Sequence, residues 1–92
     1  MHPLTQAEIA TRLASHPEWT VADGVLTRTF AFKDFVAALG FVNRVGDAAE
    51  AAGHHPDIDI RYNRVRLALV THDAGGITAR DFSLAAQADK LA

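Results

Sequence analysis

Three histidines in the second half of the chain have types and spacing suited to acid-base chemistry. His54 and His55 are adjacent and precede Pro56 in the segment Gly-His-His-Pro-Asp, and His72 follows in a later segment. Imidazole titrates near neutral pH, so it can donate or accept a proton there, and it is also a common metal ligand. The pattern therefore leaves two kinds of site open, a proton-transfer site and a metal site.

Two segments of alternating apolar and polar residues, on either side of Asn63-Arg64, predict an antiparallel β-hairpin. A turn centred on Asn63-Arg64 would place His55 opposite His72. A turn centred on Asn63 alone would place His54 opposite His72. In either register, the three imidazoles share one end of the predicted sheet.

Two carboxylates are candidates for partners of these histidines. Glu50 precedes His54 by about one helical turn, and Asp81 lies in the first turn of the last predicted helix. A carboxylate that accepts a hydrogen bond from an imidazole fixes its tautomer, as acid-base histidines require. Structural roles are also open, because Asp81 ends a capping box that starts at Thr78, and Glu50 suits an exposed helix position or a partner for Arg44 or His54.

Gly53 and Pro56 flank the histidine pair and restrict the path of the backbone. Glycine lets the chain turn sharply after a helix, and proline fixes the exit from that turn. Neighbouring residues of an extended backbone point to opposite sides, so joint ligation of one tetrahedral ion by His54 and His55 is awkward. Metal-free proton transfer is therefore the first hypothesis, and a metal site built from His54, His55 and His72 is the second.

The rest of the chain predicts the elements that must position these residues. Capping boxes predict a first helix over about 5–15 and a last helix from Thr78, and an Asp23-Gly24 turn predicts a hairpin between them. Asp34 and Gly53 predict the two ends of the longest helix. The order αββαββα indicates one two-layer α+β domain over residues 1–92, with helices on one face of a four-stranded antiparallel sheet.

Apolar residues at helical spacing define one face of the longest predicted helix. Phe35, Leu39, Val42 and Ala49 mark this predicted core face, and Phe41 and Val45 lie beside it. The uncovered sheet face and the sheet edges favour assembly with a further copy.

Composition narrows the function classes. The 92 residues have a net charge of -2, 49% hydrophobic residues and no cysteine. Disulfides and thiolate chemistry are therefore excluded, and the acidic balance disfavours nucleic acid as a partner. No apolar segment has the length of a membrane span and no secretory signal is present, so we expect a cytoplasmic protein that does not enter a membrane.

The site residues and their spacing resemble the signature of the pterin-4a-carbinolamine dehydratases, and the likeness extends through FKDF, GFVNRV, YNRV and RDFSLA. The matching residues are Glu50, His54, His55, Pro56, Tyr62, His72 and Asp81. The resemblance implies a four-stranded antiparallel sheet with helices on one face. It implies loss of water from 4a-hydroxytetrahydropterin to give the quinonoid dihydropterin, with no metal or organic cofactor. It also implies a homo-oligomer, either dimer or tetramer, and functional coupling to an aromatic amino-acid hydroxylase.

The resemblance also implies roles for individual residues. His54 and His72 match the acid-base positions, and His55 matches the position that holds the pterin and helps to deprotonate it. Asp81 matches the carboxylate that orients a histidine, and Glu50 takes the first position of the signature. Residues implied to line the pterin pocket are Gly53, Val70 and Thr71.

Two features depart from the eukaryotic members of that family. Glu18 stands where a glycine often precedes the tryptophan, and Asp57-Ile58-Asp59-Ile60 replaces an aromatic-rich strand. These departures put assistance to a transcription factor in doubt without affecting the dehydratase residues. A dimerising, coactivator-like binding module remains the alternative function, and a role in molybdopterin metabolism is the alternative setting.

Overall fold

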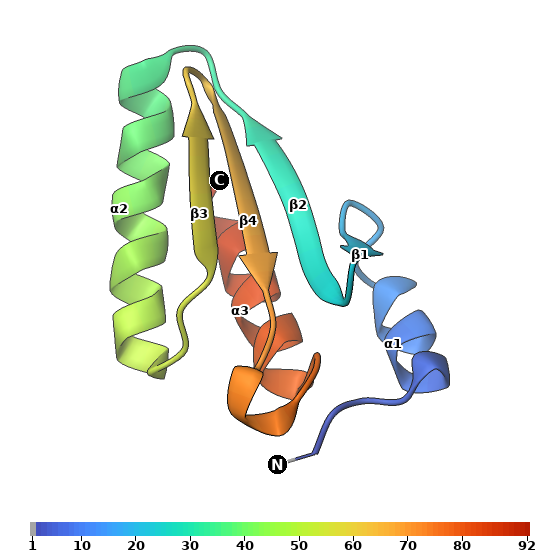
Figure 1. Cartoon of the computed structure of the whole chain (residues 1–92). Coiled ribbons are helices and arrows are strands. Elements are labelled where there is room, and N and C mark those ends of the chain that lie inside the picture. The colour runs from blue at the N-terminus through green and yellow to red at the C-terminus, as the bar shows by residue number, and fades with distance from the viewer. Residues whose placement is uncertain (1) are drawn as a thin grey trace.

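The computed structural model describes residues 2–92 and has the predicted element order αββαββα (Figure 1). Between the last strand and the last helix it adds one 3-10 turn, η1 (His72–Ala74). The helices are α1 (Gln6–Leu13), α2 (Phe35–Ala52) and α3 (Ala79–Leu91). The strands are β1 (Thr20–Ala22), β2 (Val25–Ala31), β3 (Asp57–Arg61) and β4 (Arg64–Leu69).

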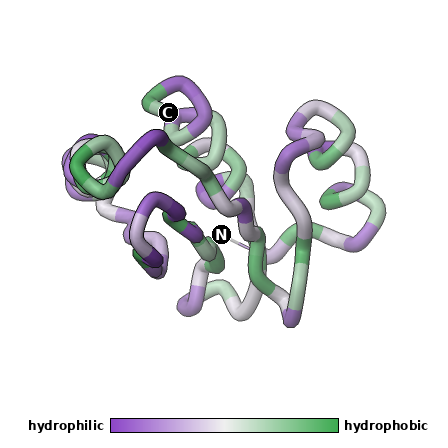
Figure 2. The backbone as a smooth tube through the Cα atoms, turned by 90° about the horizontal axis from the view of Figure 1, so that it is seen from above, coloured by the Kyte–Doolittle hydropathy of each residue, from purple (hydrophilic) through white to green (hydrophobic). Residues whose placement is uncertain are grey.

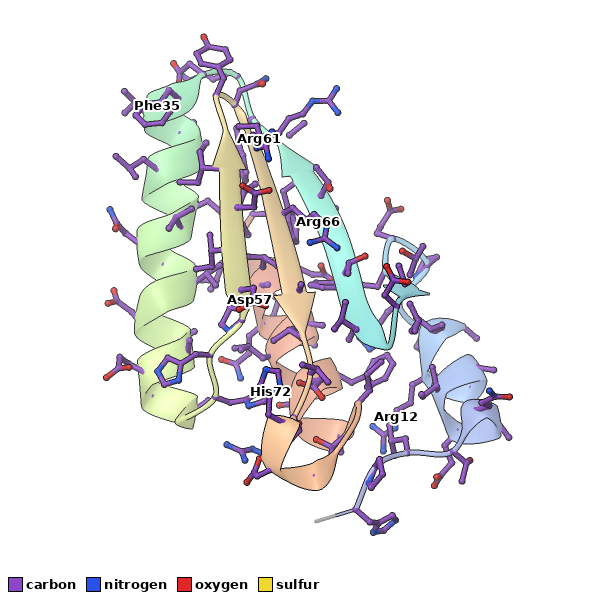
Figure 3. All side chains as sticks on the ribbon, viewed as in Figure 1. Arg12, Phe35, Asp57, Arg61, Arg66 and His72 are labelled. Atoms are coloured by element: carbon purple, nitrogen blue, oxygen red, sulfur yellow. The ribbon has the colours of Figure 1, made fainter. Side chains whose placement is uncertain are left out.

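The four strands form one antiparallel sheet in the order β1-β2-β4-β3. The view along the strands shows the helices on one side of this sheet (Figure 2). The side chains that the sheet buries against them are Leu26, Phe30, Val65, Leu67 and Leu69. Polar side chains, among them Asp57, Arg61 and Arg66, occupy the open face (Figure 3). The predicted two-layer α+β architecture is confirmed.

Helix α2 begins and ends where its capping residues predict. The Asp34 carboxylate accepts a hydrogen bond from the Ala37 N–H at 2.8 Å. Gly53 ends the helix in the left-handed region at φ 61°, a conformation that glycine adopts at little cost. This glycine turns the chain directly into the histidine pair.

The core face of α2 differs in part from the predicted one. The buried residues are Ala38, Phe41, Val45 and Ala49, whereas the Phe35 and Leu39 side chains are 45% and 41% exposed. Phe41 sits at the centre of the core, with its ring centroid 4.7 Å from that of Phe30 and 5.0 Å from that of Phe32. The aromatic residues of β2 and its following turn thus select the stripe that contains Phe41.

The β3–β4 hairpin is confirmed, but both predicted registers are wrong. Arg61 pairs with Arg64, so the turn residues are Tyr62 and Asn63. Tyr62 has φ 51°, an uncommon value for a bulky residue. Asn63 forms two hydrogen bonds with Phe32, as donor in one and as acceptor in the other. The Asn63 side-chain amide donates to the Phe32 carbonyl at 2.7 Å, and the Phe32 N–H donates to the Asn63 carbonyl at 2.9 Å. This anchor on the end of β2 fixes the turn one residue earlier than expected.

Helix α3 is joined to the middle of β2 and to the segment before β1 by a polar cluster around Asp89. Its carboxylate accepts hydrogen bonds from the Trp19 indole N–H at 2.9 Å and from the Arg28 guanidinium at 2.7 Å.

Both predicted capping boxes, at Thr5 and at Thr78, are present. Within residues 2–92, no helix combines the length and the apolar character of a membrane span.

Candidate active site

A cavity of about 300 Å³ lies where α2 ends, β4 ends and α3 begins. Its lining residues are Gly53, His54, His55, Val70, His72, Asp73 and Arg80. The structure therefore brings together the three histidines that the sequence singled out. They meet through the two connecting loops and not through a cross-strand histidine pair, because the strand ladder already stops at Asp57 and Ala68.

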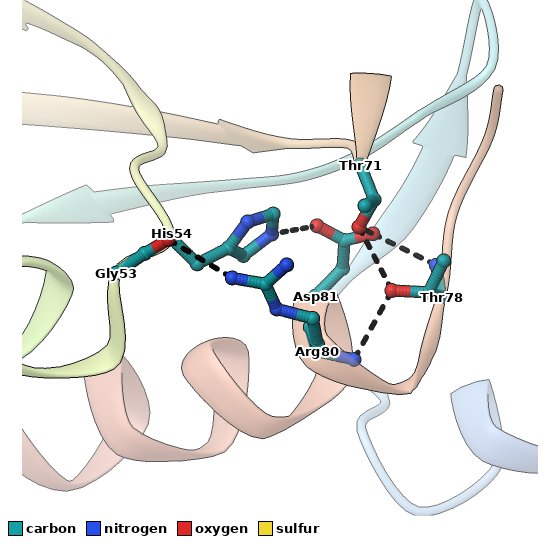
Figure 4. A network of polar contacts seen from close by, with 6 residues as sticks. All are labelled: Gly53, His54, Thr71, Thr78, Arg80 and Asp81. Atoms are coloured by element: carbon teal, nitrogen blue, oxygen red, sulfur yellow. Dashed lines mark hydrogen bonds and ion pairs between the residues drawn. The ribbon is translucent and has the colours of Figure 1, made fainter. Parts of the chain in front are cut away.

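His54 is held by a fully buried carboxylate on α3 (Figure 4). Its Nε2 lies 2.5 Å from Asp81 Oδ1, and Asp81 is 0% exposed. The second oxygen of Asp81 accepts the Thr71 hydroxyl at 2.9 Å and the Thr78 N–H at 2.8 Å. Asp81 therefore completes the capping box of α3 and orients His54 at the same time, so its two predicted roles are not alternatives.

The partners of Asp81 determine which ring nitrogen of His54 carries the proton. A carboxylate that already accepts two hydrogen bonds acts as an acceptor toward the imidazole as well. His54 consequently donates its Nε2–H to Asp81, which leaves Nδ1 as the acceptor nitrogen of the neutral ring.

His55 has a carboxylate partner of its own, separate from that of His54. Its Nε2 lies 2.5 Å from Glu50 Oε2, one turn back on α2. The side chains of this pair are 61% and 80% exposed, in contrast to the buried pair of His54 and Asp81. The two adjacent histidines thus bond to carboxylates of different helices, α3 for His54 and α2 for His55.

His72 is exposed and opens the 3-10 turn η1, close to the end of β4 (Figure 3). The Thr71 and Gly76 main chains bond to each other and close the loop that carries His72. In the described part of the chain, its imidazole has no hydrogen-bond partner within the protein. His72 is therefore free to interact with a molecule in the cavity.

Thr71 and Val70 differ in what they offer to the cavity. The Thr71 side chain is buried and bonds to Thr78 at 2.8 Å and to Asp81, and its main-chain N–H and carbonyl bond within the loop. Thr71 thus supports Asp81. Val70 lines the cavity directly, while Pro56 is half-buried at the entry to β3.

Sequence reasoning missed two charged residues of the cavity wall, Asp73 and Arg80. Arg80 donates from Nη2 to the Gly53 carbonyl at 2.9 Å, which joins α3 to the end of α2 beside the histidine pair (Figure 4). Its position beside Asp81 in the capping box was the available signal. Side chains of neighbouring helix residues point in different directions. The side chain next to a capping carboxylate can therefore reach another part of the segment that the carboxylate contacts.

Within residues 2–92, no three His, Asp or Glu side chains are grouped as ligands of one metal ion. The two adjacent histidines instead bond to separate carboxylates through Nε2.

The chain resembles known proteins over almost its whole length. The family model described as pterin 4 alpha carbinolamine dehydratase matches residues 2–91. Relatives provisionally named pterin-4-alpha-carbinolamine dehydratase include one from Chloroflexus aurantiacus, 58% identical over 99% of this chain and 98% of its own. Another, from Acidobacterium capsulatum, is 60% identical over 99% of both chains.

Solved structures agree with the family match. A crystal structure described as a transcriptional coactivator/pterin dehydratase from Brucella melitensis superimposes with a TM-score of 0.95, at 35% identity over 99% of both chains. A pterin dehydratase-like protein described as a RuBisCO assembly factor shares the fold at a TM-score of 0.65 and 23% identity, over 79% of this chain and 84% of its own. On the family match and the identities to its relatives, the chain belongs to the pterin-4-alpha-carbinolamine dehydratase family.

Proposed function

We propose that the chain catalyses loss of water from a 4a-hydroxytetrahydropterin, which gives the quinonoid dihydropterin. The observation that carries the proposal is the convergence of His54, His55 and His72 on one cavity of about 300 Å³. That volume is at the lower end of the range for small-molecule sites and suits a flat bicyclic ring. Family membership points to the same reaction.

The reaction needs an acid and a base at two positions of one ring. The C4a–O bond breaks and the hydroxyl leaves as water after it receives a proton. The ring nitrogen bonded to C4a loses its proton, and the C4a=N double bond forms. Imidazoles can carry out both proton transfers near neutral pH, so no other reactant is required.

We assign the base to His54, because donation of Nε2–H to Asp81 leaves Nδ1 to accept the proton of the ring nitrogen. We assign the acid to His72, because its imidazole forms no hydrogen bond with another side chain among the described residues. His55, oriented by Glu50, holds the ring from the other side. Each proton transfer then occurs at a different position of the substrate.

The Val70 main chain would bind the amide-like edge of the pterin, with the second lone pair of the Gly53 carbonyl as a further acceptor, since both residues line the cavity. The proposed mechanism uses no metal and no organic cofactor. The substrate would come from an aromatic amino-acid hydroxylase in the cytoplasm, as part of tetrahydrobiopterin recycling.

We further propose that the protein works as a homo-oligomer. Phe35, Val36 and Leu39 leave a stripe of α2 exposed, with exposed fractions of 45%, 77% and 41%. A contiguous apolar stripe on a small domain favours contact with another protein surface.

Ultraviolet detection of 4a-hydroxytetrahydropterin breakdown, with and without purified protein, tests the activity. We expect clear acceleration above the spontaneous rate, and no acceleration would refute the proposal. Metal analysis of the active preparation tests the metal-free part, because stoichiometric zinc or iron that is required for activity would contradict it.

A dimerising, coactivator-like binding module is the second candidate function. The name of the Brucella melitensis protein includes a coactivator role for that protein, and the exposed stripe of α2 supports such a role here. Partner binding that survives His54→Ala would favour this function, because it would be independent of the histidine site. A role in molybdopterin metabolism would instead leave the chemistry unchanged and alter the source of the pterin.

A further inference from the structure

Two more cavities follow the active-site cavity along the seam between α2 and α3. The first, of about 190 Å³, shares His54 and Arg80 with the active-site cavity. The second, of about 500 Å³, shares Gln87 with the first. Shared walls make these cavities neighbours, so the seam extends the histidine site toward the C-terminal end of α3.

Residue spacing on the two helices explains why the seam is hollow. On α3, Arg80, Ser83, Gln87 and Lys90 recur at intervals of three or four, so they lie along one face. On α2, the residues that face them include Ala48 and Ala52. Alanines at this spacing lack the bulk to fill the space between the helices, so a groove with a largely apolar wall stays open there, and charged side chains stand along it.

The charges along the seam are unbalanced. Arg80, Arg44 and Lys90 line it, and Asp47 is the acidic residue there. Among residues 2–92, none of these three cations has a carboxylate within 4.0 Å. Arg80 and Arg44 instead donate to the carbonyls of Gly53 and Leu91. A row of cations without acidic partners, in a chain with net charge -2, forms a locally positive groove.

We propose that this seam binds an anionic substituent of the pterin substrate, with carboxylate or phosphate groups at the end of a long side chain. The inference rests on the proposed function, because the pterin ring must occupy the histidine cavity. Arg80 and Lys90 lie about 15 Å apart along α3, at a rise of about 1.5 Å per residue. A side chain of roughly that length would place its terminal charge between Arg44 and Lys90.

Equilibrium binding of stable pterins to the full chain tests this proposal. Folic acid and pteroic acid are a matched pair with the same ring and spacer. Pteroic acid ends in one carboxylate at the close of the spacer, whereas folic acid extends further by a glutamate with two carboxylates, so the pair tests whether charge placed farther along the seam adds affinity. We expect folic acid to bind at least tenfold more tightly than pteroic acid at low ionic strength. In Lys90→Gln, most of this difference in affinity should disappear. Arg66→Gln is the matched control, since it removes one positive charge from the open sheet face and should leave the preference intact.

Neopterin, which has a short neutral side chain, separates failure of this inference from failure of the proposed function. If neopterin does not bind and its 4a-hydroxy form is not dehydrated, the proposed function fails. If neopterin binds but folic acid gains nothing over pteroic acid, or keeps its advantage in Lys90→Gln, the seam proposal is overturned. Competition by pyrophosphate and by glutarate at equal ionic strength then identifies whether the seam prefers phosphate or carboxylate.

Discussion

His54 Nε2 and Asp81 Oδ1 lie 2.5 Å apart, and the pair joins the end of α2 to the start of α3. The same carboxylate accepts hydrogen bonds from Thr71 and Thr78 and is fully buried. One side chain therefore holds a helix cap, the loop before His72 and the imidazole of His54. Fold stability and the orientation of the proposed base depend on the same atoms.

Asp81→Asn should lower both activity and stability. An amide offers one acceptor oxygen in place of two, so at least one of the donors from His54, Thr71 and Thr78 would stay buried and unpaired. Such a loss costs about 1–3 kcal/mol. Dehydratase turnover should fall by about 10²-fold or more, because His54 is no longer held in one tautomer. Urea unfolding and the ultraviolet assay measure the two effects, and wild-type turnover in the folded variant would contradict the role of Asp81.

Asp89→Asn separates stability from catalysis on the same helix. Asp89 accepts hydrogen bonds from Trp19 and Arg28, far from the histidine cavity. We expect a loss of about 1–3 kcal/mol in the free energy of unfolding, because the oxygen that accepts from both Trp19 and Arg28 becomes a neutral amide oxygen and the bonds to it lose their charge assistance. Turnover of the folded fraction should stay near that of the wild type. A large fall in turnover would show that the Asp81 result reflects general loosening of α3.

His72→Ala should lower turnover by at least about 10²-fold, the size expected when a general acid or base is removed. The free energy of unfolding should change little, because the His72 side chain is exposed. His2→Ala is the matched control, since His2 is also exposed and does not line the cavity. An unchanged rate in His72→Ala would remove this residue from the mechanism.

Glu50→Gln should affect substrate binding more than stability. The Glu50 and His55 pair is solvent-exposed, so its loss should change the free energy of unfolding by less than about 1 kcal/mol. We expect KM to rise because His55 loses its fixed orientation, whereas kcat should change less than in Asp81→Asn. Steady-state kinetics of the two variants, measured side by side, provide the check. A fall in kcat with unchanged KM would place Glu50 in the chemical step.

Short-range signals in the sequence predicted the element boundaries and the candidate residues. Capping residues act through bonds to main-chain groups two or three residues away, so Thr5, Asp34 and Thr78 are readable without tertiary information. The helix end at Gly53 could be predicted for the same reason, because glycine is favoured where the local backbone adopts a positive φ. The clustering of the histidines was predicted from the hairpin, and it holds although both predicted registers are wrong, because the loops after α2 and β4 end at the same end of the sheet.

The hairpin register was not readable from the alternation. Registers that differ by two residues keep every side chain on its own face, so Val65 or Leu67 could face Ile60 equally well. The contact of Asn63 with Phe32, which follows β2 and lies far away in the sequence, decides the register. The core face of α2 was difficult to predict for the same reason. Contacts with distant aromatic residues in the core bury Phe41, whereas Phe35 stays exposed.

Acid should loosen the start of α1 through Glu8. A hydrogen bond from the Thr5 N–H, with further help from the Thr5 side chain, His2 and Arg12, lowers the pKa of the Glu8 carboxyl below its ordinary 4.5. Because the folded pKa is lowered, the stabilisation is fully present above the unfolded value and is lost as pH falls through the folded one. NMR titration of the Glu8 carboxyl, together with amide exchange in α1, should show both events in the same pH range. Glu8→Gln keeps the capping hydrogen bond without a titrating group, so its α1 amides should lose this pH dependence. An unchanged pH profile in Glu8→Gln would assign the acid sensitivity of α1 to another group.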